Sequence, residues 1–370
     1  MGRLSPKTLE LMLLRTGFNW FYQLSYYLGR PKKRQVTFAT MRSATLTDNL
    51  KALHAEFLAA GETDVKVLCF HYDRTLQSKF GFLWASLKAL WLLATSELFV
   101  IDDYFFPLYA VNKHERNQVV QLWHAVGSLK KFGLSLPHAD QSVIKPHTNY
   151  DWVFVNAASE QFAYVDAFDI DPDHVVVTGA PMVDQLMRQR PLTHVGPHRL
   201  LYSPTHRPGT DGTAKVLAYV QALVRASQNL TENWEIYISL HPYLHVPALD
   251  LPANVHVFQD ANRVKRLMPT VDLFVTDYSS LSLSFSHYNR PILLYTPDYA
   301  DYVKACGFYV DYFKYLGAPD FQSAPDLVNF INQDLTRLDL DYVQALHTKT
   351  FTHQDGHNAQ RVFQFLMKLL

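Results

Sequence analysis

Four polar segments of the sequence each follow a short apolar run, and each carries residues that can move a proton or bind phosphate. The first segment is QLWHAVGSLKKFG (121–133), in which His124 ends an apolar run and a glycine-containing turn is expected to open toward a helix. An imidazole titrates near neutral pH, so His124 can accept a proton from an alcohol. Lys130 and Lys131 follow one to two helical turns later, either as phosphate ligands or as solvated lysines.

The second and third segments add more cationic and hydroxyl groups. LLYSPTHRPGT (200–210) holds Thr205, His206 and Arg207 in a turn, and an arginine can bind two phosphate oxygens at once. An ordinary polar turn is the alternative. In SLHPYLH (239–245), His241 directly follows an apolar run. A metal pair of His241 and His245 would need a helix, which the proline at 242 disfavours, so no metal site is predicted.

The fourth segment is TDYSSLSLSFSHYNRPILLYTPDYADY (276–302). Asp277 ends an apolar run, and Ser279 and Ser280 are expected at the start of a helix. Backbone N–H groups and hydroxyls at a helix start can bind an anion, although such serines are often simple caps. The sequence has no P-loop, no GxGxxG after a strand, and no HExxH or GxSxG motif.

The elements that must position these segments alternate regularly along the chain. Short buried strands separated by amphipathic helices predict parallel sheets with helices on both faces. Strands are expected at 36–40, 65–70, 98–103, 119–124, 152–157 and 174–179, and then at 199–204, 235–242, 255–259, 273–277 and 292–295. Each of the four polar segments then follows the carboxyl end of a strand, where open α/β sheets bind their ligands.

The length of 370 residues accommodates two domains, and the segment RQRPLTHVGPHR (188–199) has the prolines and weak periodicity of a linker. We therefore predict two doubly wound, Rossmann-like α/β domains, 36–190 and 198–335, that face each other across a cleft. A separate N-terminal segment, 1–35, precedes them, and C-terminal helices occupy 336–370.

The N-terminal segment combines aromatic residues, such as Trp20 and Tyr27, with a basic cluster between Arg30 and Arg34. Arg15 and Gln23 interrupt its apolar character, so a helix lying in the lipid headgroup region is predicted rather than a membrane-spanning one. The alternative is a helix packed on the protein body. No secretory signal is visible.

Composition excludes several classes of protein. A formal net charge of zero speaks against a nucleic-acid partner. Two cysteines, Cys69 and Cys306, cannot form a disulfide framework or a thiolate zinc site, which suits a reducing cytoplasm. No cofactor motif is evident, and Mg²⁺ held only through a bound nucleotide would leave no trace in the sequence.

Together, the four segments resemble the CDP-glycerol glycerophosphotransferase family, the teichoic acid primases and polymerases of Gram-positive bacteria. GAPMVDQL (179–186) also resembles a family motif, GxPRxDxL, with Met182 where an arginine is usual, and Ala125 replaces a usual glycine. The matching residues are Gln121, Trp123, His124, Gly127, Lys130, Lys131, Gly133, Tyr202, Pro204, Thr205, Arg207, His241, Pro242, Thr276, Asp277, Tyr278, Ser279, Ser280, Phe285, Tyr288, Arg290, Pro291, Tyr295, Asp298 and Tyr302.

The resemblance implies a glycosyltransferase-B-like fold and a peripheral enzyme on the cytoplasmic face of the membrane. Such an enzyme moves glycerol phosphate from CDP-glycerol to a lipid-linked or polymeric wall teichoic acid or polysaccharide acceptor and releases CMP. It implies that His124, from an acceptor-side first domain, is the general base and that His241 stabilises the leaving phosphate. The expected donor ligands in the second domain are Thr205, Arg207, Asp277, Ser279 and Ser280, and the expected contacts to acceptor or phosphate are Trp123, Lys130 and Lys131.

Three alternatives stay open at this point. The donor could be CDP-ribitol, since the donor-side motifs do not distinguish the two polyols. A nucleotide-sugar transferase or epimerase would share the architecture. A non-catalytic protein that binds the membrane surface could use the same scaffold, although the presence of both His124 and His241 speaks against it.

Overall fold

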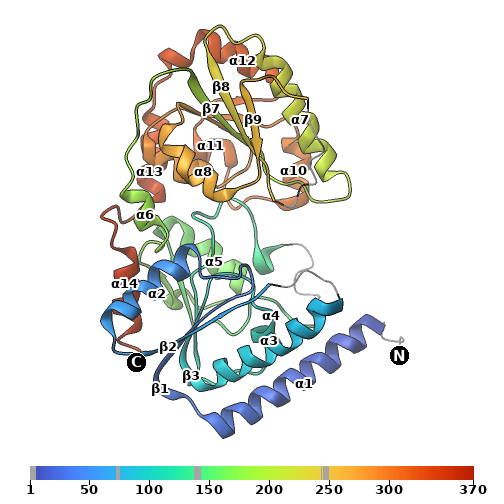
Figure 1. The fold of residues 1–370 in the computed structure, drawn as a ribbon, viewed down its shortest axis with the longest axis vertical. Coiled ribbons are helices and arrows are strands. Elements are labelled where there is room, and N and C mark those ends of the chain that lie inside the picture. Colours follow the sequence, from blue (N-terminus) through green and yellow to red (C-terminus); the bar gives the residue numbers. More distant parts are fainter. Residues whose placement is uncertain (1–5, 72–75, 137–142, 243, 245–249) are drawn as a thin grey trace. The chain divides into compact units, whose positions relative to one another are not determined.

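The computed structural model describes residues 6–71, 76–136, 143–242, 244 and 250–370. The chain divides into two compact units, and the division falls between Gln185 and Leu186. The first unit is Met1–Gln185 together with Phe351–Leu370, and the second is Leu186–Thr350. Each unit is built on its own parallel sheet (Figure 1).

The sheet of the first unit has six strands in the order β2-β1-β3-β4-β5-β6, all parallel. The chain starts at β1, adds β2 on one side, and continues with β3 on the other side. The strands are β1 (Lys32–Thr40), β2 (Asp64–Cys69), β3 (Ser96–Ile101), β4 (Gln118–Gln121), β5 (Trp152–Val155) and β6 (Val175–Val177). The switch point of this sheet, where ligands of open α/β sheets bind, is therefore between β1 and β3.

Helices cover both faces of this first sheet, because its strands are apolar on both sides. Val36 and Phe38 of β1 pack toward α2 (Asp48–Ala60) and α14 (Asn358–Leu366). Ala39 packs on the opposite face, with α1 (Pro6–Gly29) and α3 (Leu76–Thr95). Shorter helices complete the unit: α4 (Phe106–Tyr109), α5 (Gln161–Phe168) and α6 (Val183–Met187), which runs across the division. This arrangement buries the central strands on both faces, as the sequence predicted, whereas the edge strand β2 stays largely accessible.

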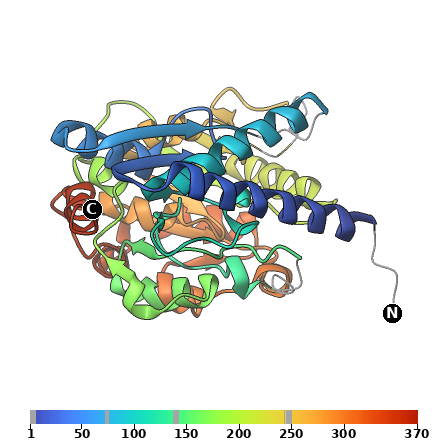
Figure 2. The same cartoon turned by 90° about the horizontal axis from the view of Figure 1, so that it is seen from below.

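The N-terminal helix α1 belongs to the first unit. The sequence analysis instead predicted a separate segment with a boundary at residue 35. α1 runs alongside α3 (Figures 1 and 2). Phe18 and Tyr22 on its inner side are buried, and the Tyr22 hydroxyl donates to Oδ1 of Asn117 at 2.6 Å. α1 is part of the first unit because one of its faces completes the hydrophobic core of that unit, whereas its other face stays exposed.

The sheet of the second unit also has six parallel strands, in the order β12-β11-β10-β7-β8-β9. The strands are β7 (His198–Ser203), β8 (Trp234–Ser239), β9 (Val255–Phe258), β10 (Leu273–Thr276), β11 (Ile292–Tyr295) and β12 (Asp320–Phe321). The helices are α7 (Gly212–Ser227), α8 (Ala261–Leu267), α9 (Leu281–Phe285), α10 (Tyr299–Cys306), α11 (Tyr312–Leu316), α12 (Ala324–Gln333) and α13 (Asp341–Thr350). The switch point lies between β7 and β10. The two-residue β12 is the one strand of this sheet that the sequence did not predict.

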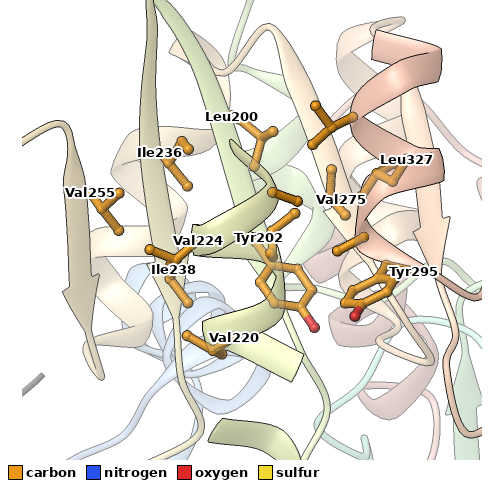
Figure 3. Packing of buried hydrophobic residues seen from close by; sticks show 14 of the residues in the cluster. Leu200, Tyr202, Val220, Val224, Ile236, Ile238, Val255, Val275, Tyr295 and Leu327 are labelled. Carbon is orange, nitrogen blue, oxygen red and sulfur yellow. The ribbon is translucent and has the colours of Figure 1, made fainter. Parts of the chain in front are cut away.

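One face of the second sheet packs against α7 and α12 (Figure 3). Val220 and Val224 of α7 lie over Ile236 and Ile238 of β8, and Leu327 of α12 lies near Tyr295. The rings of Tyr202 and Tyr295 lie side by side, with centroids 6.0 Å apart. This core fixes β7, β10 and β11, whose carboxyl ends carry two of the polar segments.

The C-terminal helices divide between the two units, whereas the sequence analysis grouped 336–370 as one segment. α13 packs in the second unit, and α14 returns to the first, where it packs on α2 (Figure 1). The return is held by Asp184, whose carboxylate accepts hydrogen bonds from the backbone N–H groups of Asn358 and Ala359, both at 2.8 Å. Those groups begin α14 and have no partner within the helix. The Asp of GAPMVDQL therefore docks the C-terminal helix.

Candidate active site

Two of the four polar segments meet at the switch point of the second unit. The turn after β7 carries Thr205, and the segment after β10 begins at Asp277. The backbone N–H of Thr205 donates to both carboxylate oxygens of Asp277, at 2.8 and 3.0 Å. The sheet order places β10 next to β7, which brings together segments more than 70 residues apart in the sequence.

Arg207 is the centre of a buried ion-pair cluster at this point. Its Nη1 lies 2.8 Å from Oδ2 of Asp277, and its Nε and Nη2 donate to the two carboxylate oxygens of Asp298, at 2.7 and 2.9 Å. Its Nη1 also donates to the Thr205 carbonyl oxygen at 2.6 Å. The side chains of Arg207 and Asp277 are only 4% and 1% exposed.

Aromatic rings enclose the same guanidinium. Its central carbon lies 4.8 Å from the ring centroid of Tyr278 and 5.0 Å from that of Tyr302. Burial alone would lower the pKa of Arg207, but the carboxylates of Asp298 and Asp277 outweigh burial and raise it. Arg207 is therefore charged, and its donors are directed at protein carboxylates.

This geometry corrects the role expected for Arg207 and Asp277. The sequence analysis assigned both as direct donor ligands, but their charged groups are buried against each other and against Asp298. They hold the turn after β7 against the segment after β10. They are thus positioning residues for Thr205 and the serines that follow Asp277.

Ser279 and Ser280 precede α9, which has five residues and so offers only a single helical turn. Oγ of Ser279 accepts from the backbone N–H of Leu281 at 3.2 Å, and the Ser279 carbonyl accepts from Ser282. Ser279 therefore acts as a local cap, which was the alternative left open for it. The proposed contact of Ser279, Ser280 and Thr205 with a donor phosphate stays a prediction.

His241 lies two residues beyond β8, the strand next to β7. Its ring lies 5.7 Å, centroid to centroid, from that of His206, which belongs to the turn after β7. The Gln259 side chain donates to the His241 carbonyl at 2.9 Å and fixes this turn. The structure therefore brings the second, third and fourth polar segments to one edge of the second sheet. His245 lies outside the described residues.

In the first unit, His124 follows β4 by three residues and is one-third exposed. Its Nδ1 lies 3.5 Å from Oδ1 of Asp103, which is the second residue beyond β3. Burial lowers the pKa of His124, and the Asp103 carboxylate opposes that effect without cancelling it. The imidazole is therefore neutral at pH 7, the form in which it accepts a proton. The helix expected after His124 is absent from the described residues, which form bends and a short 3-10 turn at Gly133–Ser135.

Trp123 was expected to contact the acceptor or its phosphate, but its ring is packed inside the first unit. It stacks on Phe132, with centroids 5.1 Å apart, and meets the edge of Phe168 at 5.4 Å. Trp123 is 9% exposed, so we assign it to the core beneath His124. Lys131 is exposed and Lys130 is half-buried; their contact with phosphate stays a prediction.

Sequence reasoning missed several charged residues around His124. Arg42 follows β1, and its Nη2 lies 3.0 Å from Oδ2 of Asp48 and 3.5 Å from Oδ2 of Asp102. Burial raises the pKa of Asp102 to about 6, although Arg42 lowers it. The sequence did contain a signal for part of this cluster, because two aspartates end the apolar run LFVIDD at the carboxyl end of a strand.

Comparison with known proteins identifies the family. Residues 21–368 match the model of the CDP-glycerol:poly(glycerophosphate) glycerophosphotransferase family. The chain belongs to this family. The match runs through both units and includes all four polar segments.

Curated relatives match from about three quarters of the chain to nearly all of it. The chain is 28% identical to the teichoic acid ribitol-phosphate primase of Bacillus spizizenii over 98% of both proteins. It is 25% identical to the teichoic acid glycerol-phosphate primase of Bacillus subtilis over 77% of both. Family membership therefore does not by itself select one polyol.

Solved structures show the fold. The wall teichoic acid polymerase TagF superposes with a TM-score of 0.68 at 16% identity, covering 99% of this chain and 98% of that one. A UDP-N-acetylglucosamine 2-epimerase from Listeria monocytogenes, itself a putative one, superposes with a TM-score of 0.58 at 14% identity, covering 91% and 96%. The prediction of two parallel α/β domains of the glycosyltransferase-B kind is confirmed.

Proposed function

We propose that this protein transfers a polyol phosphate from a CDP-polyol to a wall teichoic acid acceptor and releases CMP. The observation that carries the proposal is the family match through both units, whose motif residues lie at the carboxyl ends of their sheets. In open α/β sheets that edge is where ligands bind. Two relatives, which match 98% and 77% of this chain, are teichoic acid primases.

The reaction assigns distinct work to the two units. A hydroxyl of the acceptor attacks the phosphorus that carries the polyol, and His124 takes the hydroxyl proton. The bond from that phosphorus to the bridging oxygen breaks, and its electron pair leaves with CMP. His241, Thr205, Ser279 and Ser280 bind the donor diphosphate and stabilise the charge that develops on the departing phosphate. No step requires a covalent enzyme intermediate.

The donor proposed from the family resemblance is CDP-glycerol. CDP-ribitol is the second candidate, and the similarity to a ribitol-phosphate primase over 98% of the chain favours it. The two donors differ in the length of the polyol, and the donor diphosphate contacts proposed here are common to both.

The test is nucleotide release from the purified protein with a lipid-linked acceptor and one of three donors: CDP-glycerol, CDP-ribitol or UDP-N-acetylglucosamine. We expect acceptor-dependent CMP release from a CDP-polyol, measured by ion-exchange chromatography, and the more efficient CDP donor identifies the polyol. Reactions without acceptor measure donor hydrolysis. UDP as the sole product would instead indicate a nucleotide-sugar enzyme, and no nucleotide from any donor would favour a non-catalytic binding protein.

We also propose that the first unit binds the cytoplasmic face of the membrane peripherally, through α1 and α3. Trp20 on α1 is 67% exposed and Trp84 on α3 is 75% exposed. The other large exposed apolar side chains on each helix recur at spacings of three, four or seven residues, which places them on one face: Leu9, Met12, Leu13, Leu24, Tyr27 and Leu28 on α1, and Phe80, Leu83 and Trp91 on α3. The exposed basic residues Lys32 and Lys33 follow α1, as expected for a surface that meets anionic lipid.

Replacing Trp20 and Trp84 together by glutamine should weaken binding to phosphatidylglycerol-containing vesicles by about 10- to 10²-fold, since each buried apolar side chain contributes on the order of 1.5 kcal/mol. Co-sedimentation measures the binding. Leu58→Gln, which changes a 58% exposed apolar residue on α2, is the control. Equal binding by the double variant and the wild type would contradict this surface. Within the described residues, no helix is both long and apolar enough to cross a bilayer.

A further inference from the structure

A cluster of charged residues lies next to His124, at the switch point of the first sheet. β1 lies between β2 and β3, and β4 follows β3, so the carboxyl ends of β1, β3 and β4 are neighbours. Arg42 extends from the end of β1, Asp103 from the end of β3, and His124 from the end of β4. None of the four polar segments includes Arg42 or Asp103.

The carboxylate of Asp103 is held in place by several contacts. Its Oδ1 accepts from the backbone N–H of Tyr104 at 2.6 Å, and its Oδ2 lies 4.0 Å from Nε of Arg42. The Gln121 side chain donates to the Asp103 carbonyl at 3.1 Å and accepts from the backbone N–H of Trp123 at 2.8 Å. Gln121 therefore ties the segment that bears Asp103 to the turn that bears His124.

The turn that presents His124 is held from a second side. Trp123 has a φ of 55°, in the left-handed region that a bulky residue seldom adopts. The buried side-chain amide of Asn49, on α2, donates to the carbonyl of Trp123 at 2.8 Å and to that of Leu122 at 3.3 Å. The backbone conformation that directs His124 is thus maintained by side chains from β4 and α2.

We propose that Asp103 is a positioning residue that orients the His124 ring and keeps its Nδ1 protonated, so that Nε2 is the nitrogen that accepts the acceptor's proton. This inference rests on the proposed function for the role of His124 as base. The 3.5 Å separation between Nδ1 and Oδ1 is too long for a hydrogen bond, and Nδ1 has no hydrogen-bond partner among the described residues. It is expected to shorten when His124 becomes charged during the transfer, because the ion pair then forms.

The other charged and titratable groups around His124 support this assignment. Arg42 lowers the pKa of His124, whereas the main chain of Asp102 and, less strongly, the Asp48 carboxylate at the start of α2 raise it. His147 is buried, and burial lowers its pKa to about 4, so it is neutral. Asp103 contributes the largest effect that raises the pKa of His124. Replacing it by asparagine should therefore lower that pKa.

The test compares Asp103→Asn with the wild type in two measurements. NMR titration of histidine-ring-labelled full-length protein, with the His124 signal assigned by its loss in His124→Gln, should show the His124 pKa falling by about 1 unit in Asp103→Asn. Acceptor-dependent CMP release should fall about 10²-fold in kcat, as expected for a misoriented base, while KM for the donor is unchanged. The acidic limb of the pH–rate profile should move to lower pH with the His124 pKa.

The matched control is Asp64→Asn, which removes a carboxylate from an exposed ion pair with Lys66 in the same unit. It should leave the His124 titration and CMP release at wild-type values.

A reduced rate in Asp103→Asn with a wild-type His124 titration would show a merely structural effect and overturn the inference. The NMR titration does not depend on the reaction, so it tests the Asp103–His124 pair even if the proposed function fails. Wild-type behaviour of Asp103→Asn in both measurements would refute the pair and leave the proposed function standing.

Discussion

Replacing His124 by glutamine should lower acceptor-dependent CMP release by about 10²–10⁴-fold, the range expected for loss of a general base. Glutamine is similar in size and can still form hydrogen bonds, but it cannot accept a proton at neutral pH. His124 is partly exposed, so its replacement should cost little stability. Steady-state kinetics measure the loss of activity, and urea unfolding of the same preparations measures any loss of stability.

The same residue predicts the pH dependence of the wild type. Only the neutral imidazole accepts a proton, so the rate should rise with pH through the pKa of His124 and be lost below it. Burial lowers that pKa from the ordinary value of 6.5, so the acidic limb should lie below pH 6.5. His198→Gln is the control, because His198 begins β7 and lies at the opposite end of that strand from the candidate site. An unchanged rate and acidic limb in His124→Gln would show that another group is the base.

Replacing Arg207 by methionine should destabilise the second unit by about 3–5 kcal/mol, the usual cost of removing one partner of a buried ion pair. Asp277 and Asp298 would be left without their counter-ion, and the rings of Tyr278 and Tyr302 would lose a cation–π partner. Urea denaturation followed by tryptophan fluorescence measures the change. Arg207→Lys should recover only part of it, because an ammonium group cannot bind both oxygens of Asp298 in the planar geometry seen here.

Two further comparisons make the Arg207 result specific. Arg266→Met removes an exposed arginine that lies 3.5 Å from Asp260, and it should cost less than about 1 kcal/mol.

Burial would raise the pKa of Asp298, but Arg207 outweighs burial and lowers it. Because the folded-state pKa is depressed, this stabilisation is present above about pH 4 and is lost as pH falls through the folded-state pKa. Arg207→Met should lack this acid-dependent loss. Equal stability of Arg207→Met and Arg266→Met would refute the buried cluster.

Local sequence patterns predicted most of the two sheets. Runs such as LFVT and ILLY form β10 and β11, which are buried at every position. Their apolar character on both faces requires layers of helices on both sides, and this determines the fold class. The same patterns placed Thr205, His241 and Asp277 just beyond strand ends, because polar residues that stop an apolar run mark where a strand leaves the sheet.

Local patterns could not predict which charges would meet. Arg207 was interpreted as a phosphate ligand because an arginine in a turn has the same local sequence whether it faces solvent or a buried carboxylate. Its partner Asp298 is 91 residues away and reaches it only because β11 joins β10 in the sheet. Trp123 was likewise assigned to the acceptor, because its local sequence does not show that its ring packs on Phe132, nine residues further along the same segment, and on Phe168 of α5.

The sequence by itself determined the family, the two α/β domains and the segments that carry His124 and His241. Only the tertiary structure decided that Asp103 lies behind His124, that Arg207 and Asp277 neutralise each other, and that α14 returns to the first unit. The physical reason is that hydrophobic periodicity specifies which residues are buried, whereas strand order specifies which buried residues are neighbours. That order is settled by packing between segments 60 or more residues apart, such as Arg42 with Asp102 and Asp184 with Asn358.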